Sequence, residues 1–254
     1  MLVRVMGLTI HYQIRLKASD TESGYVDALQ IVKRAQAFAR KLERQRLVAG
    51  VGEITSSAAA LAIAPVFNRR FNQEHGWGWK PAFPEAGWLF QVDIGDGCES
   101  LRLGLCRYPY AGPYIGPRRW AKLHSPEQAV WRLEGFCKTQ YASRHGWEHF
   151  RRCHVEVIEL LEHWRTFGAS VQIKDEGGFW PRYSENKLRR NIVEYDQCIA
   201  AFGGALKDAA GECGETIEAP IFNHPQFEQL EAQGMAEHGG KIGRAVEIVK
   251  RATS

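Results

Sequence analysis

The segment LEGFCKTQYAS at residues 133–143 begins the part of the chain that decides the fold. Its alternating side chains predict a strand in which Phe136, Lys138 and Gln140 share one face. The next segment, residues 147–167, has an apolar residue every three or four positions, which predicts an amphipathic helix. The segments SVQIK at residues 170–174 and DEGGFW at residues 175–180 then predict a second strand and a polar turn.

The first part of the chain predicts more strands and one long helix. Residues 8–17 alternate between apolar and polar side chains, which is typical of a strand with one buried face. Residues 25–46 predict a helix with a basic second face. Residues 88–94 and 101–107 predict a hairpin joined by a Gly-Asp-Gly turn. The apolar run at residues 58–66 is expected to form a buried strand.

Two segments rich in aromatic residues and proline are expected to be irregular. Residues 67–87 contain tryptophans and prolines, which favour a loop that closes one end of the core. Residues 108–126 carry Arg118 and Arg119 beside several aromatic side chains. Such a composition can stack nucleic acid bases, and it also makes an ordinary ordered surface loop.

The last part of the chain predicts one long helix and a tail. Residues 184–210 have an apolar stripe, and Ser184 is a suitable N-cap. Residues 216–254 are more polar and contain two prolines. We expect them to form a tail with a short helix at residues 241–251, which docks on the domain or on a partner.

The order of these elements favours an α+β fold with a mainly antiparallel sheet and helices on one face. Residues 1–215 are expected to form a single domain, followed by the tail. Two strand–helix–strand passages also allow for duplicated ferredoxin-like units at residues 6–107 and 130–210, although no repeat of residues marks them.

The composition is that of an ordinary globular protein, with 254 residues, 44% hydrophobic residues and a formal net charge of +4. No apolar run approaches the roughly 20 residues that cross a bilayer, and the signal-peptide pattern is absent, so we expect no membrane span and a cytoplasmic location. The six cysteines form no C-x-x-C pair, which favours free thiols. The mildly basic charge permits nucleic acid binding without requiring it.

Four segments resemble an uncharacterised bacterial protein family: MGLTIHY at residues 6–12, FCKTQYAS at 136–143, RCH at 152–154 and DEGGFW at 175–180. The resemblance covers about residues 6–211 and implies a bacterial cytoplasmic protein. No activity is known for that family, so the resemblance assigns no role to any residue.

The polar face of the predicted sheet is the first candidate site. Cations beside an acid and several amides are suited to a small polar or anionic ligand, and Lys138 or His11 would act as a base if desolvated. The turn at residues 175–180 extends this site, because ligands often bind beyond the ends of strands. The expected ligand-binding residues are His11, Arg15, Asp93, Arg102, Lys138, Gln140, Asp175 and Glu176.

A metal site is a separate hypothesis. His145, His149 and Cys153 are four residues apart, so a helix that starts at residue 144 would bring them to one face. Zinc needs a fourth ligand from elsewhere, and exposed histidines are common on helices, so we predict no metal site. The sequence also lacks a phosphate-binding loop, G-x-S-x-G and H-E-x-x-H, and identifies no cofactor.

Three functions follow from these observations. The favoured one is binding of a small polar or anionic ligand on the sheet face, with catalysis left open. The first alternative is a nucleic-acid-binding module that uses Arg15, Arg102, Lys138 and the loop with Arg118 and Arg119. The second is a subunit of a larger assembly that docks through residues 216–254. The polar face is also compatible with a homodimer.

Overall fold

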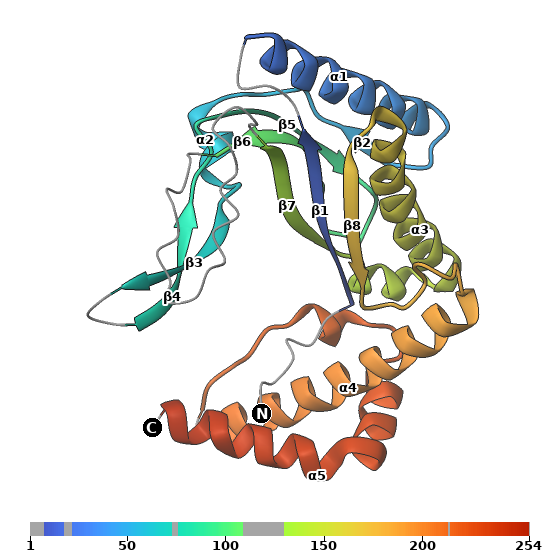
Figure 1. The fold of residues 1–254 in the computed structure, drawn as a ribbon. Coiled ribbons are helices and arrows are strands. Elements are labelled where there is room, and N and C mark those ends of the chain that lie inside the picture. The colour runs from blue at the N-terminus through green and yellow to red at the C-terminus, as the bar shows by residue number, and fades with distance from the viewer. Residues whose placement is uncertain (1–7, 18–21, 73–75, 109–129, 213, 254) are drawn as a thin grey trace.

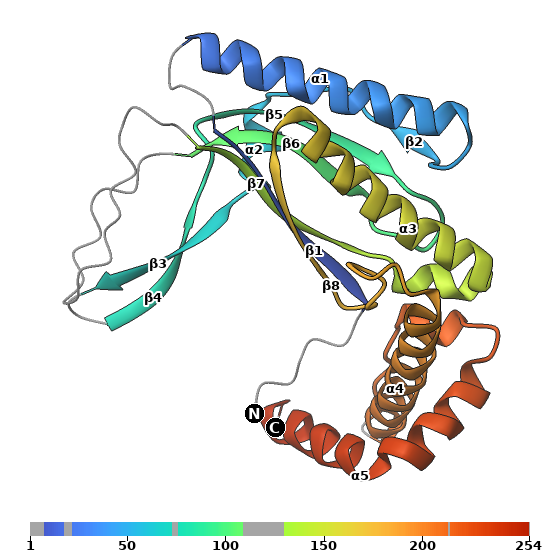
Figure 2. The same ribbon diagram turned by 45° about the vertical axis from the view of Figure 1, so that its right-hand side comes forward.

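A six-stranded antiparallel sheet lies at the centre of the computed structural model, which describes residues 8–17, 22–72, 76–108, 130–212 and 214–253 (Figure 1). The strand order is β2-β5-β6-β7-β1-β8. Their bounds are β1 (Thr9–Lys17), β2 (Gly50–Val51), β5 (Ala86–Asp93), β6 (Leu101–Arg107), β7 (Val130–Lys138) and β8 (Ser170–Asp175). Helices α1 (Glu22–Arg44) and α3 (Trp147–His163) lie on one face of the sheet (Figures 1 and 2). The predicted α+β class is confirmed.

Two crossovers share this sheet. Helix α3 and the short helix η2 (Trp164–Phe167) join β7 to β8, and β1 lies between those strands. Helix α1 follows β1, and the chain returns through β2 and β5 to β6, with β7 between β1 and β6. Strands β8, β1, β7 and β6 therefore form one ferredoxin-like unit with α1 and α3, and β5 and β2 extend its edge. The two halves of the chain each supply one crossover to this single sheet.

The core lies between the sheet and the two helices. The predicted alternation in β1 is confirmed, because Ile10 and Ile14 are fully buried while Arg15 and Lys17 are exposed. The helices contribute the other side of this layer through Val32 of α1 and Val157 of α3. Each large apolar side chain buried in this way contributes about 1.5–3 kcal/mol.

The segment predicted as a buried strand at residues 58–66 begins instead with a short helix, α2 (Ala58–Ala62). Alanine has the highest helix propensity, and four of these five residues are alanine. Ser57 is the N-cap, because its Oγ accepts a hydrogen bond from the Ala60 N–H at 3.3 Å. The prediction was wrong because apolar runs of this length do not distinguish a strand from a helix.

The predicted loop at residues 67–87 is also wrong, because most of it forms a hairpin of β3 (Val66–Asn72) and β4 (Gly76–Ala82). This hairpin extends away from the central sheet (Figure 1). Proline is tolerated in β4 because a two-stranded ribbon consists of edge strands. The segment with Arg118 and Arg119 lies outside the described residues.

The last two helices pack against each other (Figure 2). The predicted helix at 184–210 is confirmed as α4 (Glu185–Glu212), and Ser184 Oγ accepts the Lys187 N–H at 3.3 Å. After η3 (Pro220–Asn223), α5 (Phe227–Thr253) is much longer than the helix predicted at 241–251. The expected boundary after residue 215 therefore falls between two helices with a common apolar cluster of Ala201, Ala209, Ile242 and Val246.

Glycines made α5 hard to predict, and one of them permits its packing on α4. A Cβ atom at Gly234 would collide with the carbonyl oxygen of Gln197 in α4, whereas one at Gly240 would meet nothing within 4 Å. We expect Gly234→Ala to lower the free energy of unfolding by about 1–3 kcal/mol, because the helices must move apart. Gly240→Ala should raise it by up to about 1 kcal/mol through helix propensity. Urea unfolding of both variants tests this contrast, and equal changes would contradict it.

Candidate functional site

Polar side chains of three neighbouring strands line the sheet face opposite α1 and α3. Residues 11, 13, 15 and 17 of β1 alternate with the buried ones, so they point away from the helices. Strands β7 and β8 flank β1, and their register places Phe136 and Lys174 on either side of His11. We call this surface the open face; it comprises His11, Gln13, Arg15, Lys17, Arg132, Glu134, Phe136, Gln172 and Lys174.

One end of the open face is aromatic. Phe136 is 53% exposed, although it lies on a central strand among polar side chains. Its ring centroid is 6.3 Å from that of His11. Glu176, just beyond β8, holds this histidine, with Oε1 3.4 Å from His11 Nε2 and Oε2 accepting the Thr9 N–H at 3.3 Å. Glu176 therefore holds the His11 imidazole in place beside the exposed phenyl ring of Phe136.

The other end of the open face carries two arginines. Arg15 lies directly opposite Arg132, an arrangement that is destabilising when nothing neutralises it. Arg132 is partly compensated, with Nη1 3.9 Å from Glu134 Oε1 and its guanidinium 5.0 Å from the Tyr108 ring. Arg15 and Lys174 make no ion pair with any described residue. These two cations are thus available to an anionic ligand.

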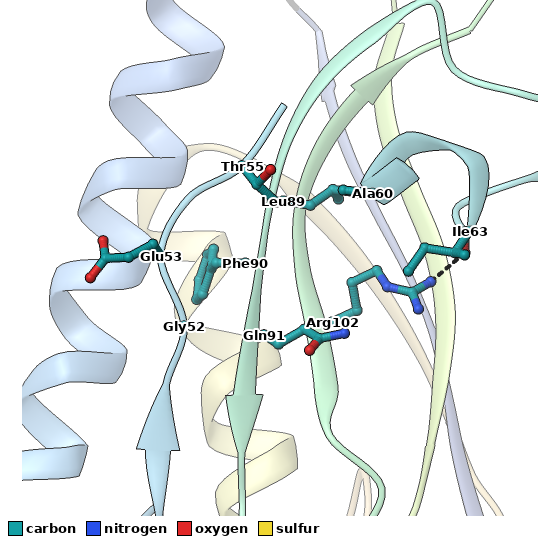
Figure 3. Close-up of a pocket in the computed structure, with 9 residues that line it drawn as sticks. All are labelled: Gly52, Glu53, Thr55, Ala60, Ile63, Leu89, Phe90, Gln91 and Arg102. Atoms are coloured by element: carbon teal, nitrogen blue, oxygen red, sulfur yellow. Dashed lines mark hydrogen bonds between the residues drawn. The ribbon is translucent and has the colours of Figure 1, made fainter. Parts of the chain in front are cut away.

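A small depression lies beside Arg102, further along the same face, with a volume of about 230 Å³ (Figure 3). Gln91, Ile63 and Leu89 are among its lining residues. Arg102 Nη1 donates to the Ile63 carbonyl at 2.5 Å, and its buried Nε has no hydrogen-bond partner within the described part of the chain. The depression is smaller than the about 300–1,000 Å³ of typical ligand pockets, so it suits a single polar group better than a whole metabolite.

Six of the eight predicted site residues fall into three groups, and Gln140 and Asp175 lie elsewhere. His11 and Glu176 are in contact at the aromatic end of the open face, and Arg15 lies at its other end. Lys138 lies at the end of β7, with Nζ 3.9 Å from Glu99 Oε1. Asp93 and Arg102 belong to strands further along the sheet; Asp93 is three strands from β1, or about 14 Å, so it cannot share a small pocket with His11.

Gln140 does not lie on the sheet face. Strand β7 ends at Lys138, and Gln140 begins the short helix η1 (Gln140–His145). Its buried amide accepts the Leu8 N–H at 3.1 Å and donates to Asp196 Oδ1 at 3.3 Å. The alternation predicted through residue 142 was wrong because the chain turns into η1, where Gln140 ties β1 to α4.

Asp175 lies on the helix side of the sheet, within a buried network. Its Oδ1 is 3.1 Å from His154 Nε2, and His154 Nδ1 is 2.8 Å from Thr139 Oγ1. Asp175 also accepts the Gly177 and Trp180 N–H groups at 2.6 and 2.9 Å. Burial opposes ionisation, but the His154 contact and these N–H groups outweigh it and lower the pKa of Asp175.

The order hydroxyl, imidazole and carboxylate in this network is that of a catalytic triad. The side chains of His154 and Asp175 are both 0% exposed, however, so a substrate cannot reach them. We therefore interpret the network as structural: it fixes the turn after β8 against α3. The expected pocket that combines Asp175 with the polar sheet face does not form, because Asp175 and Glu176 point to opposite sides.

The three residues of the zinc hypothesis are occupied by other contacts. His149 Nε2 is 2.7 Å from the Asp96 carbonyl and 3.6 Å from Cys153 Sγ, while His145 Nε2 accepts from Arg144 at 3.1 Å. Among the residues that the structure describes, no group of three or more His, Cys, Asp or Glu side chains is arranged to hold a metal ion.

The sequence places Phe136 on the same face as Lys138, but neither Phe136 nor Arg132 was among the expected ligand-binding residues. Both lie an even number of residues from Lys138 in β7 and therefore point to the same side of the sheet. Because Lys138 was predicted as a site residue, the alternation alone could have identified them. The position of Phe136 beside His11 becomes evident only from the pairing of β7 with β1.

Comparison with known proteins found no match: no family model, no curated protein and no solved structure is similar to the chain. Within the described residues, every helix is too short or too polar to cross a membrane.

Proposed function

We propose that the open face binds an anionic ligand and that this ligand is single-stranded nucleic acid. The observation that carries the proposal is the exposed phenyl ring of Phe136 beside His11, on two inner strands of a polar sheet face. An exposed aromatic ring adds little to the stability of the free protein, but it offers a flat apolar surface to a planar base. Stacking of a base on such a side chain is worth about 1–3 kcal/mol.

Charge supports the same ligand. Lys174 is in the row of His11 and Phe136, and Arg15 lies four residues along β1, or about 13 Å away. Cations at that distance from a stacked base are positioned for neighbouring phosphates, and they have no ion-pair partner among the described residues. Phosphate contacts of this kind supply most of the affinity of sequence-independent binding.

The layout is analogous to that of RNA-recognition motifs. In those domains, aromatic side chains on an open four-stranded sheet stack two or three bases. Here the aromatic pair likewise lies on two adjacent central strands of a ferredoxin-like sheet. This is an analogy of arrangement and supports the class of ligand without identifying a sequence.

The other expected functions have less support. A small ligand usually needs an enclosed pocket, whereas the depression at Arg102 is shallow and small. The expected docking tail is largely engaged, because α5 packs along α4. The bacterial origin and cytoplasmic location stay predictions from the sequence.

Fluorescence anisotropy of labelled oligonucleotides tests the proposal. A 12-nucleotide single strand should bind at 50 mM salt, and a duplex should bind more weakly, because its bases are not free to stack. Two phosphate contacts on a single strand, made by Arg15 and Lys174, predict a loss of affinity of about 7-fold between 50 and 200 mM salt.

Two outcomes would contradict this account. Absence of binding at 50 mM salt would remove nucleic acid as the ligand. Full competition by a mononucleotide at the same concentration of nucleotide would instead assign the open face to a small phosphorylated molecule.

A further inference from the structure

Two histidine–carboxylate pairs lie on opposite sides of the central sheet. His154 and Asp175 form the pair on the helix side, and both side chains are 0% exposed. His11 and Glu176 form the pair on the open face, where the His11 side chain is 45% exposed and the Glu176 side chain 22%. Of these two pairs, only the second is open to a molecule from solvent.

Backbone groups of β1 hold Glu176 in place. Its own N–H donates to the Thr9 carbonyl at 3.2 Å, and its Oε2 accepts the Thr9 N–H at 3.3 Å. Asn191 of α4 donates from Nδ2 to the Gly177 carbonyl at 2.9 Å, which ties the same turn to that helix. The carboxylate therefore has a defined position before any ligand binds, and its other oxygen, Oε1, lies beside His11.

This carboxylate selects which nitrogen of His11 carries the proton. A carboxylate can only accept, so Glu176 Oε1, which is 3.4 Å from His11 Nε2, favours a proton on Nε2. Nδ1 is then the nitrogen without a proton, and it makes no hydrogen bond with any described residue. An imidazole that a carboxylate orients in this way is suited to act as a general base, and such contacts tighten when the substrate binds.

Phe136 and Lys174 flank His11 on the two neighbouring strands. The register places His11 opposite Phe136 of β7 and opposite Lys174 of β8. Neighbouring strands lie about 4.8 Å apart, so the three residues form one short row across the open face. The ring centroids of Phe136 and His11 are 6.3 Å apart. A nucleotide stacked on Phe136 would therefore have its ribose beside His11 and its phosphate within reach of Lys174.

We propose that the open face cleaves single-stranded RNA and that His11 is the general base of this reaction. The inference rests on the proposed function, because it needs a base stacked on Phe136. It adds a chemical step and a substrate. The 2′-hydroxyl that distinguishes RNA from DNA lies next to the phosphate on the same ribose, so a base at His11 can activate it as a nucleophile.

The reaction is a transfer of the phosphoryl group within the RNA strand. His11 Nδ1 takes the proton of the 2′-hydroxyl, and the 2′-oxygen attacks the adjacent phosphorus, so that a P–O2′ bond forms. The P–O5′ bond to the next nucleotide breaks, and the 5′-oxygen takes a proton from water. The hydroxide left by that water takes the proton from His11. One fragment ends in a 2′,3′-cyclic phosphate, the other begins with a 5′-hydroxyl, and no co-reactant is consumed.

Lys174 and Glu176 stabilise the charges that develop in this step. The phosphoryl oxygens gain negative charge as the 2′-oxygen attacks, and the Lys174 ammonium is positioned to stabilise it. His11 becomes an imidazolium when it takes the proton, and the Glu176 carboxylate stabilises that positive charge. Lys174 thus acts on the substrate itself, whereas Glu176 is a positioning residue that acts through His11.

Gel analysis of labelled single strands tests the substrate. Binding is measured with RNA that carries a 2′-O-methyl group on every ribose, because this strand has no free 2′-hydroxyl to attack. We expect that strand and DNA to bind without being cleaved, and unmodified RNA to be cleaved. A DNA strand with a single ribonucleotide should be cleaved only after that ribonucleotide, and the mass of the upstream fragment should be that of a cyclic phosphate.

Variants assign the roles. His11→Ala should lower kcat by about 10²–10⁴-fold, the usual contribution of a general base, and should bind 2′-O-methyl RNA nearly as well as the wild type does. Glu176→Gln should lower kcat by a smaller factor without changing KM, a split that a merely structural role would not produce. Both variants should fold, because an exposed ion pair adds little to stability. His145→Ala removes an exposed histidine of η1 and should leave cleavage unchanged.

The outcomes separate this inference from the function on which it rests. Binding of unmodified RNA without cleavage would overturn the inference and leave nucleic acid binding in place. Cleavage by His11→Ala at the wild-type rate would also overturn it, because the activity would then belong to another residue or to a contaminating nuclease. If none of the single strands binds, the proposed function and the inference are both wrong.

Discussion

Replacing Asp175 by alanine should lower the free energy of unfolding by about 3–5 kcal/mol, because an unsatisfied buried donor costs about 1–3 kcal/mol. Three donors lose their acceptor: His154 Nε2 and the N–H groups of Gly177 and Trp180. The turn after β8 would then detach from α3. Urea unfolding at pH 7 measures this loss.

Two further variants serve as controls for Asp175→Ala. Asp93→Ala removes an exposed carboxylate at the end of β5 and should change stability by less than about 0.5 kcal/mol. Asp175→Asn keeps the size of the side chain and should cost less than alanine. Equal effects of Asp93→Ala and Asp175→Ala would contradict a structural role for the buried network.

The same network predicts how stability depends on pH. The folded protein lowers the pKa of Asp175 relative to the unfolded chain, so its contribution is fully present above the unfolded value of about 3.9. The contribution is lost as the pH falls through the lower, folded value. The difference in stability between the wild type and Asp175→Asn should therefore be constant from pH 8 to pH 5 and narrow below about pH 4. A difference that persists in acid would show that ionisation of Asp175 is not involved.

Local patterns in the sequence were enough to predict the helices and the strand that build the core. The alternation in β1 and the apolar stripes of α1, α3 and α4 follow from burial against the sheet or another helix, and they are visible within about twenty residues. Long α5 was missed because Gly234 and Gly240 weaken a helical pattern. Gly234 is favourable only in contact with Gln197, and no local window contains both residues.

Prediction of the candidate site likewise required knowledge of contacts between residues that are far apart in the sequence. The sequence gives the parity of Phe136 and Lys138 in β7, but the identity of the neighbouring strand decides what lies beside them. Pairing with β1 brings His11 to Phe136, and pairing of β1 with β8 brings Lys174 to His11.

Replacing Phe136 by alanine should weaken binding of a single-stranded oligonucleotide by about 5–150-fold, which corresponds to the loss of about 1–3 kcal/mol of base stacking. The free energy of unfolding should change little, because the side chain is 53% exposed and belongs to no part of the core. Phe136→Tyr keeps an aromatic ring at the same place and should restore binding. Ile248→Ala removes an apolar side chain of α5 that is 66% exposed, and it should leave binding unchanged.

The most direct test of the open face as a nucleic-acid-binding surface is an anisotropy titration of these four proteins, the wild type and the three variants, with one labelled single strand at 50 mM salt. We predict that the wild type, Phe136→Tyr and Ile248→Ala bind with the same affinity and that Phe136→Ala alone binds weakly. If Phe136→Ala binds the strand as tightly as the wild type does, the bases do not stack on the open face, and the proposed function is wrong.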